Sequence, residues 1–176
     1  MKNLSSNLPA LKAARVLDQL RKLAASRDVI LRTLEWVKAS LDPKFQAGIR
    51  ANMQEAEASG AVQTGDFGKA VTIYATLVER HPDSGRLHLA FGEALLGARR
   101  YTDASPQFTR AKELKGGGPR DIGLPAARAA ALAGEGDSAI GWLKSIPPQF
   151  LPAAVKDDAG FQSIRTRPDF QALFVK

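Results

Sequence analysis

The stretch that decides the fold is Gly65-Asp66-Phe67-Gly68-Lys69-Ala70, because the chain repeats the pattern that begins there 34 residues later. The matched positions keep their character: aromatic, small, aromatic and apolar. The four pairs are Phe67 and Tyr101, Ala70 and Ala104, Tyr74 and Phe108, and Leu77 and Ala111. A regular period of about 20–50 residues is typical of repeat proteins, whose units bury their apolar faces only against their neighbours.

The rest of the chain is divided by Gly and Pro into segments of helical length, and good helix formers dominate it. No segment alternates apolar and polar residues as a strand does. The sequence therefore predicts an all-α protein. The expected helices lie at about 9–25, 27–41 (with Ser26 as N-cap), 43–63, 86–98, from 103 onward and 124–132. Two more follow the turns at Gly65 and Gly134, the second of them ending before Pro147.

The 34-residue units resemble the tetratricopeptide repeat. The second unit carries the resemblance most fully, since Phe91 and Gly92 are followed by Leu95 and by Tyr101 at the turn. The resemblance implies antiparallel helical hairpins that stack into a right-handed superhelix with a concave groove. Small residues such as Gly92 and Ala104 are then expected where helices cross closely.

The end of the chain, Asp157 to Leu173, resembles the segment that closes many bacterial tetratricopeptide proteins. Its apolar residues would cover the open end of the stack, as solenoids require. The expected organisation is a basic helical hairpin (1–42), three repeat units (43–148, divided at about 43–84, 85–118 and 119–148) and capping helices (149–176).

The resemblance also implies where a ligand binds, since the first helix of each unit lines the groove. We expect leucines to form an apolar strip there and two arginines to contact anionic groups. The known carboxylate clamp of such grooves is not expected, because Glu55 and Ser59 stand where its first lysine and asparagine belong. The predicted groove residues are Asn52, Glu55, Arg86, Leu89, Glu93, Leu96, Leu124 and Arg128.

Charge is distributed unevenly. Residues 1–50 hold ten Lys/Arg and four Asp/Glu, against fifteen and fourteen in residues 51–176. A basic excess of this kind accompanies nucleic-acid or anionic-membrane binding, here through Lys12, Arg15 and Lys22, but it also marks an ordinary solvated helix face.

No catalytic constellation is recognisable. The chain has no cysteine and two histidines, His81 and His88, whose spacing matches no metal motif, so we expect a structural role for both. Gly116-Gly117-Gly118 lacks the Gly-Lys-Ser/Thr that follows a phosphate loop. We expect no enzyme activity, no metal and no cofactor.

No apolar stretch is long enough to span a membrane, and the first residues do not read as a signal peptide, so we expect a cytoplasmic protein. A periplasmic location is the alternative if the chain is a trimmed mature form.

The sequence favours a non-catalytic adaptor that binds a peptide or protein segment in the groove. Two alternatives remain open. The chain is the accessory repeat domain of a larger bacterial enzyme, or its basic N-terminal hairpin binds nucleic acid or an anionic membrane.

Overall fold

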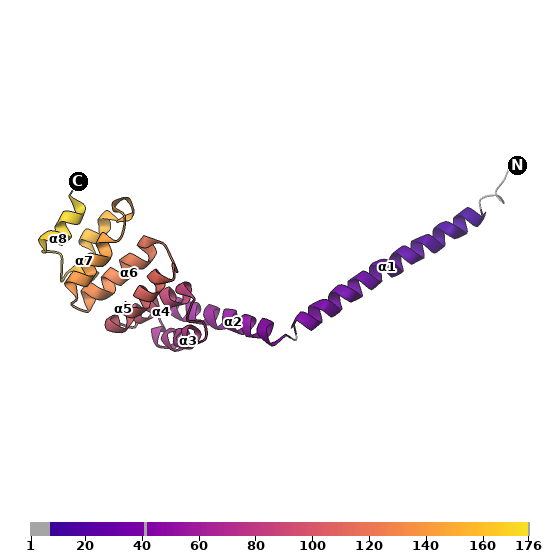
Figure 1. Cartoon of the computed structure of the whole chain (residues 1–176), viewed down its shortest axis with the longest axis horizontal. Coiled ribbons are helices and arrows are strands. Elements are labelled where there is room, and N and C mark those ends of the chain that lie inside the picture. Colours follow the sequence, from indigo (N-terminus) through magenta and orange to yellow (C-terminus); the bar gives the residue numbers. More distant parts are fainter. Residues whose placement is uncertain (1–7, 41, 176) are drawn as a thin grey trace. The chain divides into compact units, whose positions relative to one another are not determined.

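The computed structural model describes residues 8–40 and 42–175, with side chains for 14–38 and 42–175. The described residues form eight α-helices and four short 3-10 helices, and they include no strand (Figure 1). The all-α prediction is therefore confirmed. The chain divides into two compact units, residues 1–50 and residues 51–176, which are described separately.

The first unit is dominated by one helix, α1, which spans Leu8–Ser40 without a break. The helical hairpin expected over 1–42 is therefore wrong. Ser26 does not cap a second helix; its hydroxyl donates a hydrogen bond of 2.8 Å to the Lys22 carbonyl, as a serine inside a helix does. No Gly or Pro lies between residues 10 and 42 to interrupt the backbone.

Helix α2 spans Pro43–Gln63, with both bounds as predicted. Asp42 caps its start, because the Asp42 side chain accepts a hydrogen bond of 2.7 Å from the backbone N–H of Lys44. Pro43 suits the first helical position, since proline has no backbone N–H that would need an acceptor there. The part of α2 from Ala51 onward belongs to the second unit.

Five further helices build the second unit. Each packs against the next, and α4 also contacts α6 (Figure 1). They are α3 (Phe67–Arg80), α4 (Gly85–Gly97), α5 (Tyr101–Glu113), α6 (Pro119–Leu132) and α7 (Gly136–Lys144).

The turns between paired helices repeat along the chain. Gly65, Arg99 and Gly134 each adopt a positive φ, of 79°, 59° and 83°, at spacings of 34 and 35 residues. The residue after each of them is Asp66, Arg100 or Glu135. Its backbone N–H donates a hydrogen bond of 2.8 Å to the carbonyl five residues earlier, in the last turn of the preceding helix. This is the hydrogen bond of a Schellman motif, and the non-glycine Arg99 adopts the same geometry.

The core of the second unit uses the matched repeat positions. Ala70, Ala104 and Ala139 are completely buried; the first two share a core cluster with Phe108, and Ala139 lies in the next cluster along the chain. A Cβ built on Gly92 would lie 2.8 Å from the Phe108 ring. The expectation that small residues sit at close helix crossings is met at these positions.

Two helix starts differ from the expectation. α5 begins at Tyr101 rather than near 103, so Pro106 lies inside it and removes one backbone hydrogen bond. α6 begins at Pro119 rather than 124, because Pro119 is pre-set for the first helical position and Asp121 accepts the Gly118 N–H at 3.2 Å.

The C-terminal segment holds one short α-helix and 3-10 turns, where two short helices were expected. Phe161, Ile164 and Phe170 are nevertheless buried among residues of α6 and α7, and Leu173 and Phe174 are half-buried beside them. The elements are η1 (Pro148–Phe150), η2 (Ala153–Asp157), η3 (Ala159–Phe161), α8 (Pro168–Gln171) and η4 (Ala172–Phe174).

Candidate binding groove

The predicted groove residues lie on α2, α4 and α6, the first helix of each pair. On α4 they are Arg86, Leu89, Glu93 and Leu96, whose spacing of three and four residues places them on one face. Because α4 contacts α6 and an ion pair joins it to α2, the three helices form one continuous surface within the second unit.

An open hollow of about 380 Å³ lies between α2 and α4. Three predicted residues, Asn52, Glu55 and Arg86, line it together with Ala56 and Ser59. Arg86 and Glu55 form a bidentate ion pair. Both Nη atoms of Arg86 donate to the carboxylate, and Nη2 lies 2.7 Å from Oε2. The charge of Arg86 is therefore already balanced, so a ligand anion would compete with Glu55 for it.

Glu93 is the residue of this face with no compensating charge. Partial burial of its carboxylate, and then the negative charge of Asp121 on α6, raise the pKa of Glu93, although the residue as a whole is exposed to solvent. Among the described residues, none donates a hydrogen bond to Glu93 or forms an ion pair with it. A carboxylate held in this way carries an electrostatic cost that a bound cation would relieve.

The leucines of the predicted strip are only partly available. Leu89 and Leu96 are half-buried against the core of α3 to α6, and Leu124 against that of α6, α7 and the C-terminal segment. Leu89 also lies close to the backbone of Gly117, where an added Cβ would meet its side chain at 3.0 Å. The remaining exposed edges of these leucines flank Glu93 along the helix face.

Arg128 has a different role from the predicted one. Its guanidinium pairs with Asp158, and its side chain packs over Gly160, where an added Cβ would lie 2.8 Å from Arg128 Cγ. Burial works against ionisation of Asp158, but the Gly160 N–H and then Arg128 outweigh it and lower its pKa. Arg128 is thus held by the C-terminal segment, and a ligand anion would compete with Asp158 for it.

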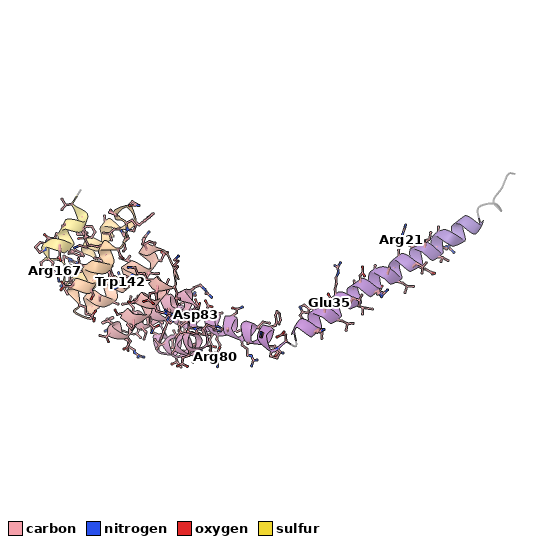
Figure 2. All side chains as sticks on the ribbon, viewed as in Figure 1. Arg21, Glu35, Arg80, Asp83, Trp142 and Arg167 are labelled. Atoms are coloured by element: carbon pink, nitrogen blue, oxygen red, sulfur yellow. The ribbon has the colours of Figure 1, made fainter. Side chains whose placement is uncertain are left out.

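A second hollow, of about 220 Å³, lies between α5, α6 and α7, and no sequence motif pointed to it. Lys112 and Trp142 line it, with Lys112 Nζ 4.8 Å from the centroid of the Trp142 ring, and Lys115 completes its basic edge. Figure 2 marks Trp142 in this part of the chain. The hollow is more enclosed than the one beside Arg86, but Lys112 is already engaged with the indole of Trp142 through a cation–π contact.

His88 has a structural role. One ring nitrogen lies 2.8 Å from Gln107 Oε1 on α5, and the other lies 3.0 Å from the carbonyl of Pro82. Each ring nitrogen thus faces a polar group of the fold, and the tautomer decides which of the two donates its hydrogen.

The basic residues considered for nucleic acid or membranes lie on α1. Arg15 and Lys22 are exposed, and Lys22 pairs with Asp18 at 2.9 Å on the same helix. The side chain of Lys12 lies outside the described residues. The only aromatic residue of α1 is Trp36, so this helix lacks the row of aromatic side chains on which a single-strand binder stacks bases.

A comparison with protein-family models and with curated proteins finds no match to this chain. Within the described residues, no helix is both long enough and apolar enough to cross a membrane. The case for function therefore depends on the geometry of the groove.

Proposed function

We propose that the second unit is a tetratricopeptide-like right-handed superhelix and that the protein is a non-catalytic binding module. The repeated positive-φ turns at Gly65, Arg99 and Gly134 support this architecture, as does the contact between α4 and α6, which brings the first helices of two successive pairs together. In such a stack the surface of α2, α4 and α6 is the concave groove.

The groove takes a peptide or protein segment that carries a positive charge. The observation that carries this proposal is the uncompensated carboxylate of Glu93, with Asp121 beside it. Arg86 and Arg128, the two cations expected to attract an acidic ligand, are balanced by Glu55 and Asp158. The sign of the preferred ligand is therefore opposite to that expected from the sequence.

The ligand also needs apolar side chains beside its cation. Leu89 and Leu96 lie three to four residues from Glu93 on either side, so they offer half-exposed apolar edges to a bound chain. A lysine or arginine flanked by apolar residues matches this arrangement. Charge pairing gives the register of such a segment, and burial of the flanking residues supplies affinity.

An array of random-sequence peptides tests the proposal, probed with the full chain and with Glu93→Gln. The wild-type protein should select peptides that contain Lys or Arg next to apolar residues. Glu93→Gln should lose that selection, because it keeps the shape of the side chain and removes its charge. Lys115→Gln is the matched control, since it changes an exposed charge at the other hollow.

Selection of acidic peptides by the wild-type protein would contradict the proposed ligand. Identical selections by the wild type and Glu93→Gln would remove Glu93 from the binding surface.

A further inference from the structure

The hollow between α5, α6 and α7 is a fixed part of the second unit. Two glycines contribute to its lining, and close packing holds the backbone at both. A Cβ on Gly117 would lie 3.0 Å from Leu89 Cδ2, and one on Gly123 would lie 2.7 Å from Ile146 Cγ1. These walls are therefore bare backbone, and the fold itself keeps the space between them open.

The inside of the hollow is apolar and small. Pro119, the buried Ile122 and the half-buried Trp142 line it, and the Ser145 hydroxyl donates a hydrogen bond of 2.7 Å to the Trp142 carbonyl. An apolar cavity of about 150 Å³ holds one benzene molecule, and sites for drug-sized ligands begin near 300 Å³. At about 220 Å³, the hollow has room for a single ring with a short side chain.

The edge of the hollow is basic. Lys112 and Lys115 line it, and the turn that ends α5 holds their backbones together, since the Lys115 N–H donates a hydrogen bond of 3.1 Å to the Lys112 carbonyl. Lys115 adopts a φ of 53° in this turn. Two positive charges thus lie at the rim of an apolar space.

The carboxylates nearest to these lysines along the chain are engaged elsewhere. Glu113 pairs with Arg110 at 3.1 Å, and Asp121 accepts the Gly118 N–H at 3.2 Å. Among residues 14–38 and 42–175, none forms an ion pair with either lysine. Both charges are therefore available to an anion.

The contact between Lys112 and Trp142 shows how a ligand would enter. Lys112 Nζ lies 4.8 Å from the centroid of the Trp142 ring (Figure 2). A cation–π contact at an exposed site is weaker than a charge-assisted hydrogen bond to a carboxylate. A carboxylate at the rim would draw the ammonium group off the indole, and an aromatic ring joined to that carboxylate would take its place.

We propose that this hollow binds a free aromatic acid, one ring that carries a carboxylate on a short side chain. Lys112 and Lys115 hold the carboxylate, and Trp142 and Ile122 contact the ring. The site is separate from the groove around Glu93, so its test does not depend on the ligand of that groove.

The first test uses phenylacetate as the probe and the indole N–H signals of the full chain in NMR spectra. The ring current of a bound phenyl group should shift the Trp142 signal, and the shift should saturate with a Kd below about 1 mM, as expected for a ligand of ten non-hydrogen atoms. Trp36 lies on α1 and is the internal control, since its signal should not move. The variant Trp36→Phe assigns the two signals.

The second test separates the two parts of the ligand. Phenylacetamide keeps the shape of phenylacetate without its charge, and acetate keeps the charge without the ring. Each should bind at least about five-fold more weakly than phenylacetate. Lys112→Gln should weaken phenylacetate by a similar factor. Lys144→Gln is the matched control, because Lys144 is an exposed lysine of α7 that does not line the hollow; it should have less than a two-fold effect.

A Trp142 signal that does not shift with phenylacetate, or that shifts equally with phenylacetamide, would overturn the proposal. Equal effects of Lys112→Gln and Lys144→Gln would also overturn it. N-acetylphenylalanine carries the same ring and carboxylate at the end of a peptide unit, so binding of this compound more tightly than phenylacetate would replace the free acid with the C-terminus of a polypeptide.

Discussion

The contact between Gly85 and Gly116 gives the sharpest test of how the second unit packs. A Cβ built on Gly116 would lie 2.1 Å from the carbonyl carbon of Gly85 and 2.2 Å from its oxygen. Ordinary van der Waals contacts begin near 3.4 Å, so the two backbone segments would have to separate by more than about 1 Å. Backbone cannot move aside as a flexible side chain can, and the start of α4 would be displaced.

The change Gly116→Ala should therefore destabilise the fold. Overpacking of this kind costs about 1–3 kcal/mol, and a backbone clash belongs at the upper end of that range. The φ of Gly116 lies outside the left-handed region, so alanine meets no backbone strain and the clash alone decides the outcome. For a chain of this size, about 3 kcal/mol corresponds to a fall in melting temperature of about 6–12 °C.

Gly141→Ala is the matched control. Gly141 lies inside α7 with open space around its Cα, so alanine should raise stability by about 0.5–1 kcal/mol through helix propensity. Thermal unfolding followed by circular dichroism compares the two variants directly. Equal melting temperatures for Gly116→Ala and Gly141→Ala would refute the close approach of Gly116 to the start of α4.

Three further substitutions are tested by the same unfolding measurement. Glu93→Gln should raise the melting temperature slightly at pH 7, because solvent screens most of the cost of an exposed carboxylate. The raised pKa of Glu93 means that its contribution is favourable below the unfolded pKa and is lost as pH rises through the folded one, so the advantage should vanish near pH 4, and an advantage that persists there would contradict it. Asp158→Asn should lower the free energy of unfolding by about 1–2 kcal/mol at pH 7. Because the pKa of Asp158 is lowered, its stabilising contribution is present above the unfolded pKa and is lost as pH falls through the folded one, so a cost of the substitution that is unchanged at the lowest pH tolerated would count against the pair with Arg128. Ala104→Leu should cost about 1–3 kcal/mol, because Ala104 is completely buried; an unchanged melting temperature would remove it from the core.

The helices of the second unit could largely be predicted from sequence, because local signals set their ends. Asp42 and Pro43 mark the start of α2, and Gly65 and Gly134 occupy turns that need a positive φ. The helix break expected at Ser26 was wrong. The sequence Ser-Arg-Asp occurs both at helix N-caps and inside helices, and only the absence of Gly and Pro around it favours a continuous helix.

The electrostatics of the groove could not be predicted in the same way. Arg86 and Glu55 are 31 residues apart, and Arg128 and Asp158 are 30 apart, so their pairing depends on how separate helices come together. The charge of the surface follows from which cations are already balanced. The proposal of a cationic ligand therefore rests on these pairings, whereas the sequence alone favoured Arg86 and Arg128 as contacts for an anionic one.

The claim that Glu93 receives the cation of a bound segment is tested most directly by a double-mutant cycle. A peptide selected by the array is titrated calorimetrically into wild-type protein and Glu93→Gln, with its lysine present or replaced by glutamine. We predict that either change alone weakens binding about ten-fold, and that the second change then has little further effect, which gives a coupling of about 1.4 kcal/mol. Additive losses from the two changes, with no coupling between them, would contradict the account.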